Sequence, residues 1–378
     1  MSGKIKVLQC VTSMNRGGLE TVIMNYYRNI DRNKFDFDFL VQRNGRFDYS
    51  DEIEKLGGKI YSIPAFSPFK VKKYNMAMKR FFEKHADQYD IIHAHNNSFA
   101  MYILRAAKGC GFDVRIAHSH IAEVKFDPIR APFIAYNKAR LKDVCTARFA
   151  CSNEAGKWLF GDDDFTIIKN AIDLEKFVFD KRKRKEYREK YDVSSRTILL
   201  GHIGRFEVQK NHLFLIKIMK VAKERGDDVK LMMIGEGRLE SNIRRLVEEE
   251  GLGDSVVFVG NVGNPQDYLN AMDVFVFPSF FEGLGMVVIE AQANGLPCVV
   301  ADTVVNECKV TPLVKFANLS NTSAGEWLKQ IMKCGKNSRK NYYLELEKAG
   351  YDIEAAVKKL ECKYEALVGD KVLMKEQN

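Results

Sequence analysis

The chain has 378 residues, of which 46% are hydrophobic and 29% charged, as is usual for a soluble globular protein. This length fits two domains of roughly 150–200 residues better than one. The N-terminus lacks the apolar core of a signal peptide, and no apolar run approaches the roughly 20 residues that span a bilayer. The eight cysteines form no CxxC pair, so neither a zinc site nor a disulfide framework is expected. We therefore predict a cytoplasmic protein.

The first half of the chain alternates short β-rich runs with longer amphipathic runs. A strand at 4–12 precedes a helix at 19–30, and "FDFDFLV" (35–41) alternates as a half-buried strand does. Later runs repeat this order, with a basic helix near 72–86. The remaining strands are expected at 59–64, 89–96, 113–120 and 147–152. Strand–helix repeats of this kind indicate a parallel sheet covered on both faces.

The pattern restarts after residue 165. A charged run at 180–192 predicts a short exposed helix, and a second series of strands follows. These strands are expected at 197–204, 229–237, 255–262, 273–279 and 297–302, with helices between them. We therefore predict an α/β protein with two doubly wound Rossmann-like domains, residues 1–170 and 171–378, that face each other across a cleft. The final helix of the second domain can pack back on the first.

The loops that follow the strands are the candidate ligand-binding segments, because ligands bind beyond the carboxyl ends of strands in open parallel sheets. After the first strand, Gly17 and Gly18 precede a helix, where missing side chains expose N–H groups to an anion. A plain turn would also explain this pair. The strand "DVRIAHSH" ends in His118 and His120, which are either structural or placed to hydrogen-bond a sugar hydroxyl.

Two cations lie in the loop after the strand at 197–204. Arg205 and Lys210 are five residues apart and feed a helix. Fixed cations in a cleft suit a diphosphate, whose charge they neutralise as it leaves. The other interpretation is a pair of solvated surface bases.

The stretch "PSFFEGLGMVVIEA" (278–291) combines two glycines with two carboxylates. Glu282, on the loop, can reach hydroxyls of a group attached to a phosphate, and Glu290, one turn into the helix, can bind ribose hydroxyls. Gly283 and Gly285 let the backbone approach a phosphate closely. The N–H groups that would face it belong to Leu284, Gly285, Met286 and Val287. These features together predict a nucleotide-sugar site; an ordinary junction would leave both glutamates solvated.

Charge clusters elsewhere suggest partners. "FDFDF" (35–39) and "DDD" (162–164) resemble metal-binding motifs, but they fit a strand and a surface turn, so no metal is expected. Between Phe66 and Arg148 the chain carries 15 Lys or Arg against 7 Asp or Glu, and the segments 66–85 and 125–142 mix bases with aromatics. An anionic membrane, nucleic acid or solvent could face them. No nucleic-acid-binding motif is present.

These motifs together resemble those of a known family. The E-x7-E pattern of Glu282 and Glu290, in "FPSFFEGLGMVVIEAQANGLPCVVAD", resembles the retaining glycosyltransferases of family 4, which have the GT-B fold. The resemblance covers nearly the whole chain: "RGGLE" resembles the family's glycine loop, "GRFEVQKNH" its phosphate-binding Arg and Lys, and "ACSNEAGKWLFG" with "IIKNAIDLEKF" its interdomain passage. "VRIAHSH" and "ADTVVNECKVTPLVKF" are similar to the EpsF-like transferases of capsule and exopolysaccharide assembly.

The chain departs from the family pattern in two places. "QANG" stands where small residues are commoner, which we expect to affect helix packing and not chemistry. Cys308 follows Glu307 in a loop whose glutamate normally approaches the donor, so the role of Glu307 stays open.

The resemblance implies sugar transfer from a nucleoside-diphosphate sugar, for which we expect UDP, to a glycan acceptor, for which we expect a lipid-linked glycan. The anomeric configuration would be retained, without a metal or other cofactor. Arg205 and Lys210 would hold the diphosphate, Glu282 the sugar and Glu290 the ribose. The remaining contacts implied are Gly17 and Gly18 with the phosphates, His118 with the sugar, and the backbone of Gly260, Asn261 and Val262 with the base.

The resemblance also gives the basic segments a role, which is docking on the anionic inner face of the plasma membrane. No nucleic-acid partner is expected. Two other functions stay open: a GT-B sugar-nucleotide epimerase, and a partner subunit that binds sugar nucleotide without turnover. A Rossmann dehydrogenase is disfavoured, because no G-x-G-x-x-G follows a strand.

Overall fold

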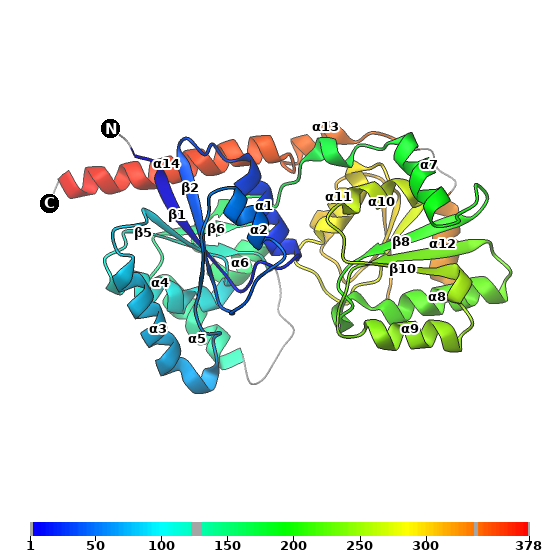
Figure 1. The fold of residues 1–378 in the computed structure, drawn as a ribbon, viewed down its shortest axis with the longest axis horizontal. Helices are drawn as coiled ribbons and strands as arrows, with labels where there is room; N and C mark the ends of the chain where they lie inside the picture. The colour runs from blue at the N-terminus through cyan, green and yellow to red at the C-terminus, as the bar shows by residue number, and fades with distance from the viewer. Residues whose placement is uncertain (1–2, 122–130, 336–338, 377–378) are drawn as a thin grey trace. The chain divides into compact units, whose positions relative to one another are not determined.

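The structure is a computed structural model that describes residues 3–121, 131–335 and 339–376. It divides into two compact units (Figure 1): unit 1 is Met1–Ile172 with Asp352–Asn378, and unit 2 is Asp173–Tyr351. The first boundary lies between Ile172 and Asp173, against 170 and 171 in the prediction, and the chain returns to unit 1 at Asp352. Each unit is a parallel sheet with packed helices, which confirms the prediction of two doubly wound α/β domains.

Unit 1 contains a seven-stranded sheet in the order β3-β2-β1-β4-β5-β6-β7. Every predicted strand of this half is present, and the two-residue β7, too short to give a periodic signal, was not predicted. The strands are β1 (Ile5–Val11), β2 (Phe35–Val41), β3 (Ile60–Ser62), β4 (Ile91–Ala94), β5 (Val114–Ser119), β6 (Ala147–Ala150) and β7 (Thr166–Ile167). The order reverses between β1 and β4, which makes this the switch point of the sheet.

Seven α-helices belong to the described part of unit 1. They are α1 (Gly18–Asn29), α2 (Ser50–Lys55), α3 (Val71–Lys84), α4 (Ala100–Gly109), α5 (Ala131–Leu141), α6 (Asn153–Phe160) and α14 (Ile353–Glu376). Figure 1 shows α3, α4 and α5 gathered on one side of the sheet, and α14 packs against α1. No helix among the described residues is long and apolar enough to cross a membrane.

The two faces of the unit 1 sheet differ in chemistry, because successive side chains of a strand point to opposite faces. Leu8, Cys10, Ile92 and Ala94 join the apolar core beneath α3 and α4. The residues that alternate with them on the neighbouring strands are polar: Gln9 in β1 pairs in register with His93 in β4. This face therefore buries a row of polar side chains at the switch point.

Unit 2 contains a six-stranded sheet in the order β10-β9-β8-β11-β12-β13. Its strands are β8 (Ile198–Ile203), β9 (Val229–Ile234), β10 (Val256–Gly260), β11 (Val274–Phe277), β12 (Cys298–Ala301) and β13 (Val314–Ala317), the last of which was not predicted. Its described α-helices are α7 (Lys181–Lys190), α8 (His212–Glu224), α9 (Glu240–Glu249), α10 (Pro265–Ala271), α11 (Met286–Ala293), α12 (Ala324–Cys334) and α13 (Tyr343–Lys348). The switch point lies between β8 and β11.

The charged run at 180–192 forms α7, as predicted, but the helix is not wholly exposed. Arg188 is 7% exposed and donates hydrogen bonds to the carbonyl of Ala271 and the carboxylate of Asp273. Arg184 reaches the same segment. The last carbonyls of a helix such as α10 have no hydrogen-bond donor within the helix. The guanidinium groups of the two arginines act as donors to them.

Candidate active-site residues

The predicted phosphate and sugar loops of unit 2 lie side by side at its switch point. The loop after β8 contains a short 3₁₀ helix, Val208–Lys210, and three hydrogen bonds tie it to the loop after β11. Gln209 accepts from the amide of Phe280 over 2.9 Å and donates from its side chain to the carbonyl of Phe281 over 2.8 Å. Asn211 donates to the carbonyl of Pro278 over 3.1 Å. The two loops therefore form one continuous surface.

Lys210 and Glu282 form an ion pair in this surface. The Lys210 Nζ lies 2.7 Å from Glu282 Oε1, and the side chains are only 16% and 8% exposed. The ammonium also lies 4.7 Å from the centre of the Phe277 ring. Burial on both sides shields the pair from water, so this is a stronger electrostatic contact than an exposed pair makes. Arg205, the other predicted cation, is exposed.

Glu290 lies in the second turn of α11 and is 7% exposed. Burial raises its pKa to about 7, and the positive charge of Lys210 partly opposes this shift. A buried carboxyl group whose pKa is raised in this way is a candidate binding group. Lys210, Glu282 and Glu290 are thus brought together by the structure.

The start of α11 is shaped by Gly285. Its φ of +73° lies in the left-handed region that side chains disfavour, and a Cβ there would lie 3.3 Å from the Phe277 ring. Gly283 and Leu284 precede it, and Met286 and Val287 begin the first turn of α11. N–H groups at the N-terminus of a helix have no partner within the helix and attract anions.

Gly260, Asn261 and Val262 lie at the end of the edge strand β10. Gly260 has a φ of +84° and its carbonyl accepts a hydrogen bond from Gly235. The amide of Asn261 lies 3.4 Å from the carboxylate of Glu236. The strands are parallel, so these residues and the Lys210–Glu282 pair all lie at the carboxyl ends of the strands of this sheet.

Gln292, the departure noted in "QANG", holds a neighbouring loop. Its amide oxygen accepts from the amides of Val310 and Thr311 over 3.1 and 2.9 Å and from the Thr311 hydroxyl over 3.0 Å. Its amide nitrogen donates to the carbonyl of Cys308 over 2.8 Å. Gln292 therefore fixes the segment that follows Glu307, a contact that the sequence did not predict.

The glycine pair of unit 1 starts α1. Gly17 is the residue before the helix, with extended backbone, and a Cβ there would lie 2.5 Å from the Glu20 carboxylate. Gly18 is the first helical residue and has nothing within 4 Å of such a Cβ. A side chain at Gly17 would only displace the flexible end of Glu20, so space alone does not require glycine there, and Gly18 leaves the helix start open.

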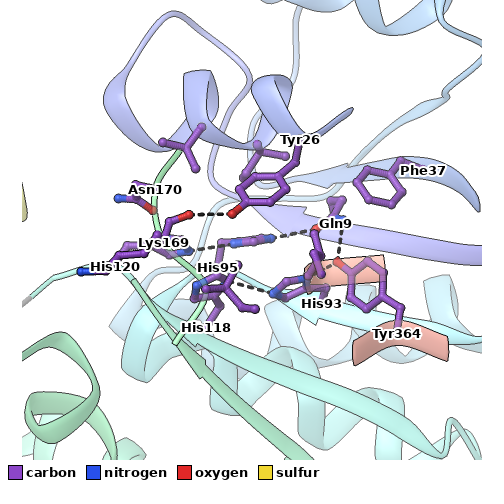
Figure 2. A pocket seen from close by; sticks show the side chains of 14 residues that line it. Gln9, Tyr26, Phe37, His93, His95, His118, His120, Lys169, Asn170 and Tyr364 are labelled. Carbon is purple, nitrogen blue, oxygen red and sulfur yellow. Dashed lines mark hydrogen bonds between the residues drawn. The ribbon is translucent and has the colours of Figure 1, made fainter. Parts of the chain in front are cut away.

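His118 belongs to a buried network that the sequence did not reveal. His93 and His95 of the β4 region and His118 and His120 of the β5 region lie on one face of the sheet, as Figure 2 shows. We call these four residues, together with Gln9 and Tyr364, the histidine chain. Two H-x-H runs, "HAH" and "HSH", were the signal that could have indicated it.

The members of the histidine chain are joined by five hydrogen bonds. Gln9 bonds the Tyr364 hydroxyl (3.3 Å) and His95 Nε2 (2.8 Å). His93 bonds the Tyr364 hydroxyl through Nδ1 (2.6 Å) and His118 Nδ1 through Nε2 (3.0 Å). His95 Nδ1 bonds His120 Nε2 (2.9 Å). His118 is therefore a partner of other histidines and is itself only 3% exposed.

All four imidazoles are neutral at physiological pH. Burial lowers the pKa of His93, His95 and His118 well below the usual value, and neighbouring histidines lower it further. Burial lowers the pKa of His120 to about 3, which the side chain of Asn170 partly opposes. A neutral imidazole can donate one hydrogen bond and accept another, as each linking member of the histidine chain must.

Three residues of this cluster lie close enough together to hold a metal ion. Nitrogen atoms of His93, His95 and His118 lie within 4.8 Å of one another. Both ring nitrogens of His93 and of His95 are already used in the hydrogen bonds of the chain. A cation would have to break these bonds to be bound.

The acidic runs have structural roles. Asp36 pairs with Lys4, and Asp38 accepts hydrogen bonds from Lys59 and Tyr89. Asp163, in the turn at 162–164, pairs with Arg148.

Family models match both units. The model described as Glycosyltransferase Family 4 matches residues 16–176, and the model described as Glycosyl transferases group 1 matches residues 183–350. The glycosyltransferase EpsF of Bacillus subtilis is 31% identical, over 94% of this chain and 95% of its own. The UDP-Gal:alpha-D-GlcNAc-diphosphoundecaprenol alpha-1,3-galactosyltransferase of Escherichia coli is 24% identical, over 81% of this chain and 82% of its own.

A solved structure shares the fold. HepE of Anabaena, in complex with UDP and glucose, matches with a TM-score of 0.72 and 15% identity, over 99% of this chain and 100% of HepE. At this identity the match is evidence for the fold. Together with EpsF, which matches along almost the whole sequence, it shows that the chain belongs to the family 4 glycosyltransferases of the GT-B fold.

Proposed function

We propose that this glycosyltransferase moves a sugar, with retention of configuration, from UDP-sugar to a lipid-linked glycan during capsule or exopolysaccharide assembly. The observation that carries the proposal is the buried Lys210–Glu282 pair beside Glu290 at the switch point of unit 2. One cation and two carboxylates in this place match the three parts of a nucleotide sugar: the diphosphate, the sugar and the ribose.

Each residue has a role in this proposal. Lys210 and Arg205 stabilise the negative charge that develops on the leaving diphosphate. Glu282 holds the reacting sugar, and Glu290 accepts hydrogen bonds from the ribose. The backbone amides from Gly283 to Val287 bind phosphate oxygens, and the backbone of Gly260, Asn261 and Val262 meets the base. In unit 1 we assign Gly17 and Gly18 to the phosphates and His118 to the sugar.

The chemistry follows from these roles. The bond between the anomeric carbon and the diphosphate oxygen breaks, and the acceptor oxygen bonds to the same face of that carbon. The leaving diphosphate takes the acceptor's proton on that face, so no side chain has to act as a nucleophile. Charge stabilisation by Lys210 and Arg205 then supplies much of the rate. Because these cations do what a divalent ion does elsewhere, we propose that no metal is needed.

The donor and acceptor are supported by what relatives bind. HepE was solved with UDP and with UDP-glucose, and the galactosyltransferase of Escherichia coli is named for UDP-Gal and a diphosphoundecaprenol-linked acceptor. We extend these two chemistries to this chain.

A lipid-linked acceptor requires access to a membrane, and unit 1 has a surface suited to it. The segment 66–85 forms α3 and the turn before it, where Phe69 is 95% and Met76 46% exposed. Lys70, Lys72 and Lys73 are exposed beside them. Of the second segment, 125–142, residues 125–130 lie outside the described residues, and α5 exposes Tyr136. We propose that α3 docks on the anionic inner leaflet of the plasma membrane.

A donor panel tests the proposal. The purified protein is incubated with UDP-, GDP- and TDP-sugars, with and without undecaprenyl-diphosphate-linked acceptor and with EDTA. Glycolipid formed from a UDP-sugar in EDTA, with the same anomeric configuration as the donor, is the expected result. Interconversion of free UDP-sugar without acceptor would instead indicate an epimerase, and binding without turnover a partner subunit.

A further inference from the structure

The hydrogen bonds of the histidine chain follow one unbroken path: His120, His95, Gln9, Tyr364, His93, His118 (Figure 2). We propose that Gln9 and Tyr364 fix all four imidazoles in one tautomer, with the proton on Nε2, and that Tyr364 is thereby a positioning residue for His118. The importance of this for sugar transfer rests on the proposed function; the assignment of the tautomers does not.

Gln9 sets the direction of one branch, because its amide oxygen can only accept and its amide nitrogen can only donate. The oxygen faces His95 Nε2 over 2.8 Å, so His95 carries its proton on Nε2. His95 Nδ1 then has a lone pair, which must accept from His120 Nε2 over 2.9 Å. His120 therefore also carries its proton on Nε2.

Tyr364 sets the direction of the other branch. Its hydroxyl oxygen accepts from the Gln9 amide nitrogen, so its own proton goes to His93 Nδ1 over 2.6 Å. His93 then carries its proton on Nε2 and donates it to His118 Nδ1 over 3.0 Å. His118 in turn carries its proton on Nε2. A half-turn of the Gln9 amide would reverse every bond and place all four protons on Nδ1.

Mixed tautomers are disfavoured by the same reasoning. A proton moved on His95, His118 or His120 would make two N–H groups, or two lone pairs, face each other at 2.8–3.0 Å, and a proton moved to His93 Nδ1 would leave the Tyr364 O–H group without this acceptor. In a buried site each such clash also leaves a polar group unsatisfied. The side chains of Gln9, His93 and Tyr364 are at most 2% exposed, so water cannot relieve it.

The two ends of the path are the groups left for a ligand. His118 Nε2 and His120 Nδ1 are buried and make no hydrogen bond of ordinary geometry with a described residue, as is also true of Asn170 Oδ1. All three residues line one small cavity of about 20 Å³. With its proton on Nε2, His118 keeps an N–H group that makes no hydrogen bond with a described residue. Toward a sugar hydroxyl, His118 would act as a hydrogen-bond donor and not as a base.

The tautomers can be read directly with the full-length protein labelled with ¹⁵N-histidine. Two-bond ¹H–¹⁵N spectra at pH 7 distinguish rings protonated on Nε2, on Nδ1 or on both nitrogens, and single His→Gln variants assign the four signals. Four Nε2–H rings are expected. A mixture, or a doubly protonated ring among the four, would overturn the proposal. Four Nδ1–H rings would mean the reverse Gln9 orientation and would overturn the donor role of His118.

Tyr364→Phe tests the positioning role, and Tyr26→Phe is its matched control. Tyr26 is another buried tyrosine that lines the same cavity, but it donates to the carbonyl of Lys169 over 2.6 Å and is not part of the path. In Tyr364→Phe, His93 and His118 should lose their fixed tautomer while His95 and His120 keep theirs through Gln9. In Tyr26→Phe all four should be unchanged.

Kinetics complete the test. We expect kcat to fall about ten-fold in Tyr364→Phe and to stay within about two-fold in Tyr26→Phe. An unchanged His118 spectrum in Tyr364→Phe would overturn the positioning role; if that variant does not fold, the wild-type spectrum still tests the tautomers. A wild-type protein with four Nε2–H rings but no transfer from any donor would overturn the proposed function alone.

Discussion

The ammonium of Lys210 and the carboxylate of Glu282 lie 2.7 Å apart although 72 positions separate them in the sequence. The cation assigned to the diphosphate is thus held by the carboxylate assigned to the sugar. The pair fixes the long side chain of Lys210, which lowers the entropic cost of using this lysine to bind a phosphate.

Lys210→Ala should lower kcat by about 10²-fold, because a charge donor to the leaving diphosphate is lost. Lys217→Ala, which removes an exposed lysine from the neighbouring helix α8, is the control and should leave kcat unchanged. Steady-state kinetics with the preferred donor, after thermal melts have shown both variants to be folded, provide the measurement. Normal turnover in Lys210→Ala would remove this residue from the site.

Substitution of the two glutamates should change different kinetic constants. Glu290 contacts ribose, which changes little during the reaction, so Glu290→Gln should mainly raise KM. Glu282 contacts the sugar as positive charge develops at its anomeric carbon, so Glu282→Gln should lower kcat and kcat/KM together, with a smaller change in donor affinity by calorimetry. If Glu282→Gln turns over normally, its assignment to the reacting sugar is wrong.

Glu290 should also make stability depend on pH. Burial raises its pKa to about 7 from the ordinary 4.5. Between these values the folded state holds a proton that the unfolded state has released, so this group's contribution to stability falls as pH rises from 4.5 through 7. Glu290→Gln is neutral throughout, and it should raise the melting temperature more at pH 8 than at pH 5. Equal shifts at both pH values would show that Glu290 is not buried as a carboxylic acid.

Gln292→Leu should detach the loop that carries Glu307. The variant keeps the side-chain volume roughly constant but leaves the amides of Val310 and Thr311 without their acceptor, at a cost of about 1–3 kcal/mol for each buried group left unsatisfied. Thr311→Val, which removes one of the four hydrogen bonds that Gln292 makes with this loop, should be milder. Thermal melts measure the loss, and an increase in KM would connect the loop to donor binding. Equal stability of wild type and Gln292→Leu would contradict this.

Replacing Lys70, Lys72 and Lys73 by Ser should weaken binding to anionic vesicles. Each basic residue near such a surface contributes about 1 kcal/mol at most, so the loss should be large at low salt and small at high salt. Replacing the exposed Lys181, Arg182 and Lys185 of α7 removes the same charge from a helix without exposed aromatics and is the control. Flotation with phosphatidylserine and with neutral vesicles measures the effect. Equal losses in both variants would leave only a non-specific charge effect.

The architecture could be predicted from the sequence because strand and helix periodicities are local. The same local signals placed Arg205, Lys210 and Glu282 on loops after strands, and the parallel sheet brought those loops to one edge. The histidine chain could not be predicted in this way. Gln9 and Tyr364 are 355 positions apart. The final helix was expected to be able to pack back on the first domain, but nothing in the sequence places Tyr364 beside Gln9. The prediction of an exposed α7 was wrong at Arg188 for the same reason: its partners, Ala271 and Asp273, lie in a distant part of the sequence.

The return of the chain to unit 1 at Asp352 has a consequence for biosynthesis. On the ribosome, residues up to Ile172 emerge first and all of unit 2 follows before α14 is made. Until then Phe35, Phe37 and His93 lack the ring of Tyr364 that packs on them. About 180 further residues are translated before α14 is made, which takes roughly 10–40 s at ordinary elongation rates. During this time the nascent N-terminal unit has an apolar face and a row of imidazoles that α14 does not yet cover. Chaperone binding and proteolysis during synthesis should concentrate on this face, and the histidine chain is among the last parts of the molecule to form.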